Sequence, residues 1–106
     1  MKWLAAPALV LAACGADTAP DVWVGSGEGI DVRLSISQLG TSATGTLHAA
    51  GLPCDYDDRL SGEWREDLIQ MESSDVRIIG IVVVGGDDMD LELIACGDVF
   101  SVWVRR

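Results

Sequence analysis

Residues 76–105 read VRIIGIVVVGGDDMDLELIACGDVFSVWVR, and this stretch decides the fold. From Met89 to Arg105, apolar and polar residues alternate with a period close to two, which is typical of strands with one buried face. Glycine and aspartate separate the apolar runs at residues 85–88 and 97–98, where hairpin turns favour them. The stretch therefore predicts three consecutive antiparallel strands that share one apolar face.

The turns also predict the pairing register, because a slip of one residue would move every side chain to the other face. Like faces meet if one turn lies at Ser74-Asp75 and a type II′ turn, with glycine first, lies at Gly97-Asp98. The expected inner pairs are Met71 with Ile78, Val82 with Leu91, Leu91 with Val104 and Leu93 with Val102. The expected outer pairs are Glu72 with Arg77 and Asp90 with Arg105.

The alternation continues upstream in short segments, at the spacing of about 8–12 residues that is typical of sandwiches and barrels. The glycine-rich stretch from Gly25 to Gly29 is interpreted as a flexible turn. Strands are expected near residues 21–25, 30–38, 44–50, 60–65, 67–73, 76–84, 89–95 and 99–105. The sequence thus predicts an all-β domain, a small antiparallel meander of about eight strands that forms a barrel or a barrel-like sandwich.

The N-terminal segment has the three parts of an export signal. A basic start, Met1-Lys2, precedes an apolar stretch from Trp3 to Ala13, and small residues stand before Cys14. The apolar stretch is eleven residues long, whereas a membrane-spanning helix needs about 20. We therefore interpret residues 1–13 as a cleaved signal peptide.

The end of this segment, Leu11-Ala12-Ala13-Cys14, resembles the lipobox of bacterial lipoproteins. The resemblance implies cleavage between Ala13 and Cys14, a diacylglyceryl thioether on Cys14 and acylation of the new amino group. Gly15, not aspartate, follows the cysteine, and in Gram-negative members of the family this favours the outer membrane. The expected parts are a signal peptide (1–13), a lipidated tether (14–20) and a β domain (21–106).

The chain is strongly acidic, since seven Lys and Arg against seventeen Asp and Glu give a net charge of −10. Loss of Lys2 with the signal changes this charge to −11. Such a charge argues against nucleic acid and anionic headgroups as partners. It keeps the domain soluble and would steer a cationic partner toward it. The absence of lysine from the mature chain excludes Schiff-base chemistry.

Two cysteines remain for the domain, Cys54 and Cys96. In an exported protein they are expected to form a disulfide. A zinc site is the alternative, but two isolated cysteines and the distant His48 do not have the usual ligand spacing. A disulfide here closes a loop of roughly 43 residues, for which the chain-entropy model gives about 4 kcal/mol.

A tryptophan in the first strand, Trp23, and an arginine at the end of the last, Arg105 or Arg106, resemble a feature of the lipocalin–avidin group of barrels. The resemblance implies that the arginine packs over the tryptophan where the barrel closes, and we assign this role to Trp23 and Arg105. The Gly-x-Trp of the family is absent, because the chain reads Val22-Trp23-Val24-Gly25.

Catalytic machinery is not evident, and we do not expect an enzyme. His48, the only histidine, is expected on an outer face opposite Ser35, without the nucleophile and acid of a hydrolytic triad. Two groups of carboxylates are candidates for calcium, which prefers several oxygen ligands on a turn. The groups are Asp55, Asp57 and Asp58 with Asp98 beside the disulfide, and Asp87, Asp88 and Asp90 at the opposite end. Neither has the EF-hand pattern, so we interpret both as solvated turns and expect no metal or cofactor beyond the lipid on Cys14.

The run from Ile78 to Val84 is apolar on both faces, which is unusual for a sheet with one solvated side. Its outward residues are expected to form a patch with neighbours on other strands. The expected members are Ile79, Ile81, Val83 and Trp103, beside Leu68 and Ile94. Such a patch serves a protein partner, self-association or the membrane, unless a loop, the tether or a second sheet layer covers it.

Together these features predict a lipid-anchored lipoprotein of the bacterial cell envelope, with a non-catalytic binding or structural role. Two alternatives from other classes stay open. One is an acidic inhibitor or binding module for a cationic protein such as a lysozyme. The other is a carrier that holds a small apolar ligand inside the barrel.

Overall fold

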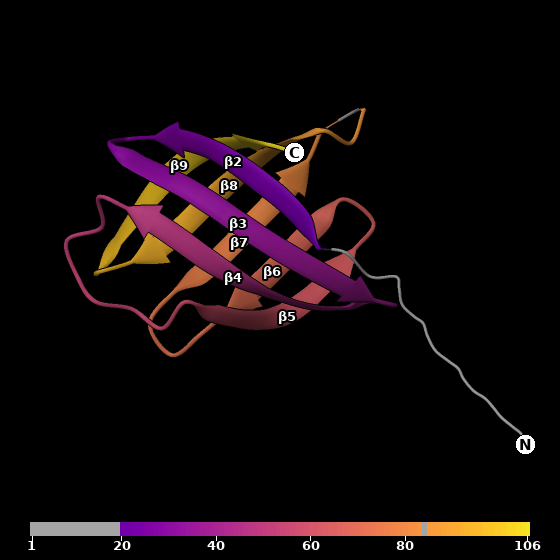
Figure 1. The fold of residues 1–106 in the computed structure, drawn as a ribbon, viewed down its shortest axis with the longest axis horizontal. Coiled ribbons are helices and arrows are strands. Elements are labelled where there is room, and N and C mark those ends of the chain that lie inside the picture. The colour runs from indigo at the N-terminus through magenta and orange to yellow at the C-terminus, as the bar shows by residue number, and fades with distance from the viewer. Residues whose placement is uncertain (1–19, 84) are drawn as a thin grey trace, which may run out of the picture.

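A computed structural model describes residues 20–83 and 85–106. Eight antiparallel strands form one closed barrel in which each strand pairs with its neighbours in sequence and the last pairs with the first (Figure 1). The strands are β2 (Asp21–Gly27), β3 (Ile30–Leu39), β4 (Ser42–Ala50), β5 (Arg59–Arg65), β6 (Leu68–Glu72), β7 (Arg77–Val82), β8 (Asp88–Ala95) and β9 (Asp98–Arg105). The predicted all-β meander is confirmed, and the barrel, not the sandwich, is its form. The signal peptide, Ala13 and Cys14 lie outside the described residues.

The barrel interior is a single apolar core. Every second residue of each strand points inward, and most of these positions are occupied by apolar side chains. The largest fully buried ones are Trp23, Leu34, Ile36, Leu47, Ile69, Met71, Ile78, Met89, Leu91, Leu93, Val102 and Val104. The period of two therefore predicted correctly which residues face the core. In a strand, alternate residues point to opposite faces, so the face of a residue does not depend on the pairing partner.

The predicted register is correct in one hairpin and wrong in another. Met71 faces Ile78 as expected. The last hairpin, however, turns through Cys96-Gly97 and not through Gly97-Asp98, because Cys96 and Gly97 both have positive φ (58° and 77°), as a type I′ turn requires. The observed pairs are Asp88 with Arg105, Asp90 with Trp103, Leu91 with Val102 and Leu93 with Phe100. The shift is two residues, so every side chain keeps its predicted face.

Two further pairings differ from expectation for the same kind of reason. Val82 faces Met89 and not Leu91, since the loop after β7 contains Gly85 and Gly86 with positive φ and is longer than a tight turn. His48 lies on the outer face as expected, but it faces Arg33, not Ser35. Here the turn begins at Gly40 (φ 63°) and leaves Leu39 opposite Ser42.

Closure of the barrel depends on glycines in β2. This strand runs through Gly25 to Gly27, and only Glu28-Gly29 forms the turn, so the interpretation of residues 25–29 as a flexible turn was wrong. A Cβ at Gly25 or Gly27 would overlap the backbone of β9. Glycine at these inward positions lets the first and last strands come close enough to pair.

The predicted disulfide is present and joins the long loop after β4 to the turn before β9. Cys54 and Cys96 are bonded, with their Cα atoms 5.7 Å apart. The same loop is held by Tyr56, whose hydroxyl accepts a hydrogen bond from the Ala49 amide (2.9 Å). Across residues 20–83 and 85–106, no helix able to bridge a lipid bilayer is found.

Replacing both cysteines by alanine (C54A/C96A) should lower the free energy of unfolding by about 4 kcal/mol, because the crosslink spans a sequence separation of 42 residues. For a small domain this is a large share of the total stability. Urea unfolding followed by tryptophan fluorescence measures it. An unfolding midpoint equal to that of the unreduced parent would contradict the assigned role.

Candidate functional site

The two ends of the barrel differ in chemistry, and each is defined by the topology. At the first end, here called the entry end, the chain enters at Pro20 and Arg106 follows β9. The other end, here called the disulfide end, carries the Cys54–Cys96 bond. The turns of the entry end are 40–41, 66–67 and 83–87, and those of the disulfide end are 28–29, 51–58, 73–76 and 96–97. In Figure 1 the entry end lies to the right.

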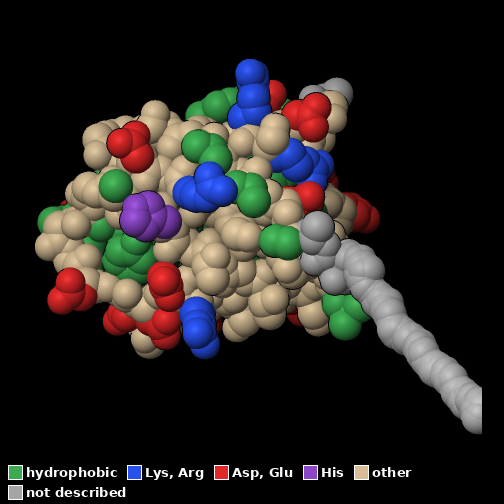
Figure 2. All heavy atoms as spheres, viewed as in Figure 1, with side chains coloured by type: hydrophobic (Ala, Val, Ile, Leu, Met, Phe, Trp, Pro, Cys, Tyr) green, Lys and Arg blue, Asp and Glu red, His purple; other side chains and the backbone are tan. Residues whose placement is uncertain are grey.

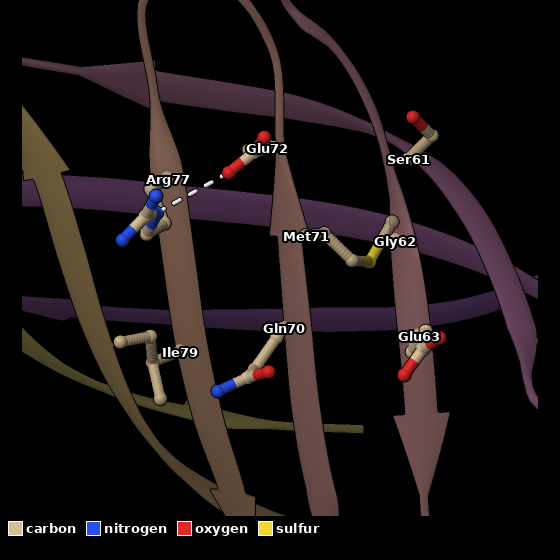
Figure 3. A pocket seen from close by; sticks show the side chains of 8 residues that line it. All are labelled: Ser61, Gly62, Glu63, Gln70, Met71, Glu72, Arg77 and Ile79. Carbon is tan, nitrogen blue, oxygen red and sulfur yellow. Dashed lines mark hydrogen bonds and ion pairs between the residues drawn. The ribbon is translucent and has the colours of Figure 1, made fainter.

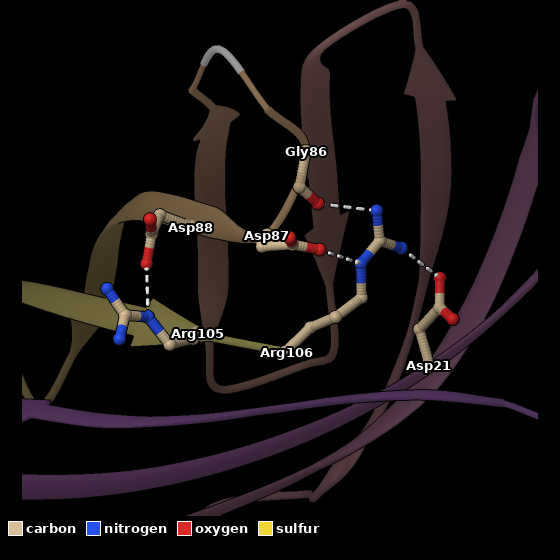
Figure 4. Close-up of polar contacts among 6 residues, drawn as sticks. All are labelled: Asp21, Gly86, Asp87, Asp88, Arg105 and Arg106. Carbon is tan, nitrogen blue, oxygen red and sulfur yellow. Dashed lines mark hydrogen bonds and ion pairs between the residues drawn. The ribbon is translucent and has the colours of Figure 1, made fainter.

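Arg106 fastens the entry end. Its guanidinium carbon lies 4.7 Å from the ring centroid of Trp23, and its Nη1 lies 2.6 Å from Oδ2 of Asp21 (Figure 4). The same guanidinium donates a hydrogen bond to the carbonyl of Gly86 and lies 3.9 Å from the Asp87 carboxylate. The Arg106 side chain thus connects the end of β9 to the first strand and to the β7–β8 loop.

The closure role assigned to Arg105 is corrected, because Arg106 is the arginine over Trp23. Arg105 points outward, where its Nε lies 2.7 Å from Oδ1 of Asp88. That hydrogen bond raises the pKa of Arg105 above its ordinary value. The physical reason is parity, since Arg105 follows the inward Val104 and must face solvent, whereas Arg106 lies beyond the strand.

Two more ion pairs lie on the outer wall. The Nε atom of Arg65 lies 2.9 Å from Oε1 of Glu63, and this hydrogen bond lowers the pKa of the Glu63 carboxyl. The Arg77 Nε atom lies 3.3 Å from Oε1 of Glu72, which agrees with the expected pair. Both pairs are exposed, so they contribute little to stability.

The remaining carboxylates gather mainly at the disulfide end. Sixteen of the seventeen acidic residues lie in the described part of the chain, and five of them form ion pairs there. Seven of the other eleven lie in or beside the turns of the disulfide end, where Figure 2 shows red patches at the left and lower left. They are Glu28, Asp31, Asp55, Asp57, Asp58, Asp75 and Asp98.

Backbone amides hold several of these carboxylates in place. Oδ2 of Asp75 accepts a hydrogen bond from the Asp57 amide (2.8 Å), and Oδ1 of Asp57 accepts one from the Arg59 amide (3.1 Å). Within residues 20–83 and 85–106, however, no three His, Cys, Asp or Glu side chains come together as a metal site would require. The acidic turns thus form a negative surface at the disulfide end.

The outward patch is present and exposed in part. Leu68 faces Ile81 across β6 and β7, and their exposed fractions are 41% and 53%. Trp103, 48% exposed, lies two strands away from Ile81, with Asp90 between them. Ile79 and Val83 are half-buried. The described residues place no second sheet layer over these side chains, because all eight strands belong to the one barrel.

Sequence reasoning missed the most exposed of the large apolar side chains in the described part of the chain. Leu39 is 81% exposed at the end of β3, beside the turn that begins at Gly40. The sequence contained a signal for it, because Leu39 is an even number of positions from Arg33 and Ser35 and therefore points outward as they do. A leucine at an outward position next to a turn glycine contradicts the alternation, and it identifies an apolar residue at the barrel rim.

Hollows lie on the outer wall of the barrel. One hollow of about 360 Å³ lies across β5, β6 and β7, where Glu72 and Arg77 pair and the Met71 side chain points away from the solvent toward Gly62 (Figure 3). A second, of about 340 Å³, is lined by His48, Tyr56 and Asp58 on the outside of β3 and β4.

The barrel interior is packed with side chains. The indole rings of Trp23 and Trp64 pack together with their centroids 6.4 Å apart. Other apolar side chains complete the core around them. Among the described residues, one buried side-chain polar atom lacks a hydrogen-bond partner, the indole Nε1 of Trp23. The hollows described above lie on the outer wall, not in this core.

No family model, no curated protein and no solved structure matches this chain.

Replacing Arg106 by glutamine should destabilise the domain by about 1–2 kcal/mol, because the substitution removes a cation–π contact and a half-exposed ion pair. Arg105→Gln is the matched control, since Arg105 is exposed and its ion pair with Asp88 lies on the outer wall. Thermal unfolding should separate the two variants. Equal unfolding temperatures for both would show that Arg106 does not fasten the barrel.

Proposed function

We propose that this chain is a lipid-anchored lipoprotein of the bacterial cell envelope, attached through Cys14, with a non-catalytic binding or structural role. The observation that carries the proposal is the sequence Leu11-Ala12-Ala13-Cys14 after a short basic and apolar leader. One acyl chain binds a bilayer only marginally, so the two or three chains of a lipoprotein are needed for stable attachment. Gly15 after the cysteine favours the outer membrane as the location.

The described domain supports a role without catalysis. Its inward side chains form one apolar core. The outer wall carries exposed ion pairs and shallow hollows. The filled interior also argues against a carrier for a small apolar ligand, because such carriers need an enclosed space in which to hold it. The outer surface is therefore the part of the domain from which binding is expected.

Changing Cys14 to serine in the full precursor should abolish incorporation of labelled palmitate and release the protein from the membrane fraction. Serine has no thiol to receive the diacylglyceryl group. Cys54→Ser is the control, because it also removes one thiol but leaves the lipobox intact. Palmitate labelling that persists in the Cys14→Ser variant would refute the anchor.

A second candidate function is capture or inhibition of a cationic protein, such as a lysozyme, by the acidic surface. Seven carboxylates without ion pairs at the disulfide end favour it. That end is opposite the point where the described chain enters at Pro20, so an anchored domain would present it to solvent. Clustered charge of one sign increases the association rate of an oppositely charged protein.

The triple variant D55N/D58N/D98N should weaken binding of a lysozyme at least tenfold at low salt, because it removes three charges from the disulfide end. The matched control E66Q/D67N/D90N removes three charges elsewhere and should have a much smaller effect. Titration calorimetry at roughly 50 and 300 mM salt gives the affinities, and binding to the parent should weaken as screening increases. Salt-insensitive binding, or equal losses in both variants, would eliminate this candidate.

A further inference from the structure

We propose that the entry end of the barrel rests on the lipid surface, with Leu39, Leu68 and Ile81 in contact with the bilayer. This inference rests on the proposed anchoring through Cys14. It assigns a partner, a lipid surface, to the exposed apolar side chains of one end, and it fixes which way the domain faces.

The covalent geometry limits which end can touch the membrane. Six residues, 15–20, separate Cys14 from Asp21, the first residue of β2, and the seven Cα–Cα steps between them reach at most about 25 Å. The ten residues of β3 extend about 33 Å, which is roughly 25 Å along the barrel axis at the usual strand tilt. Turning the disulfide end toward the membrane would therefore require a tether fully extended along the barrel wall, whereas the entry end, where the tether attaches, meets the membrane at any tether extension.

Exposed apolar side chains lie at this same end. Leu39 is the last residue of β3 and is 81% exposed. Leu68 is the first residue of β6 and faces Ile81, the second-last residue of β7. Single exposed apolar residues are common on soluble proteins. Three of the six large apolar side chains exposed on the described surface, however, lie within one residue of a strand terminus at the entry end.

The charges favour the same orientation. At the entry end, Arg106 pairs with Asp21 and Asp87, and Arg105 pairs with Asp88, so these carboxylates are largely neutralised. The acidic turn Glu66-Asp67 forms no ion pair within the described residues. Seven carboxylates without ion pairs lie at the disulfide end instead. Anionic headgroups repel carboxylates over about one Debye length, so the less acidic entry end is the one that approaches a lipid surface more readily.

A protein partner seated on Leu68, Ile81 and Trp103 is the competing explanation for the exposed side chains. Trp103 is the third-last residue of β9, with the carboxylate of Asp90 beside it. Membrane contact predicts that depth decreases from Leu39, the last residue of its strand, to Trp103, two residues inside the end of β9. A protein partner requires no such gradient and no lipid.

Quenching of tryptophan by brominated acyl chains tests the proposal with the full lipidated protein. The native Trp103 is first replaced by phenylalanine, so that Trp23 and Trp64, both buried, supply an equal background. Leu39→Trp then reports on the entry end, and Val99→Trp, at a position 56% exposed near the disulfide end, is the matched control. In vesicles of brominated phosphatidylcholine, the Leu39→Trp emission should be quenched at least threefold more than that of Val99→Trp.

Each outcome decides the proposal. Mass spectrometry of the purified protein and flotation with vesicles first establish the anchor, and a chain without lipid that does not float would overturn both the anchor and the contact. A lipidated protein that floats but shows equal quenching at both positions would overturn the contact and leave the anchor standing. Ile81→Trp, on another strand, serves as a second reporter if the Leu39 variant does not fold, and quenching no greater than that of Val99→Trp would again overturn the contact.

Discussion

The contact between the first strand and the last holds the rest of the structure, because it converts a sheet into a barrel. β2 and β9 share three residue pairs, centred on Gly25 and Val104. A side chain at Gly25 would overlap the carbonyl of Trp103, so glycine is required for this approach. Closure removes the exposed edges of the sheet and gives its inner face one enclosed core. Arg106 over Trp23 fastens this contact at the entry end.

Closure also gives the domain two ends with different chemistry. All turns must lie at one end or the other of an up-and-down barrel, and the chain places most of its unpaired carboxylates in the turns beside Cys54–Cys96. Arg105, the last residue of β9, and Arg106, which follows it, pair with three carboxylates of the opposite end, Asp21, Asp87 and Asp88. This division lets one end approach a lipid surface while the other attracts a cationic protein, and the two proposed interactions therefore do not compete for the same surface.

Much of the fold could be predicted from the sequence, because strand faces depend on local parity. The eight strands and the inward set, including Trp23 and Leu91, follow from the period of two. Register was less secure, since it depends on turn type, and a cysteine with positive φ at position 96 is rare in a type I′ turn. Gly25 resembled a turn residue for a different reason, because its role comes from a strand about eighty residues away in sequence.

The candidate site was predictable only in part. Composition revealed the excess of acid, but it did not show which carboxylates pair with arginine, because those pairs join residues such as Asp21 and Arg106 that are far apart in sequence. Native-state hydrogen exchange followed by NMR tests the closed barrel most directly. The amides of β2 and β9 that lie between the two strands should be protected as strongly as those between β7 and β8. Rapid exchange along the facing edges of β2 and β9, with protection elsewhere, would mean an open sheet and would contradict this account.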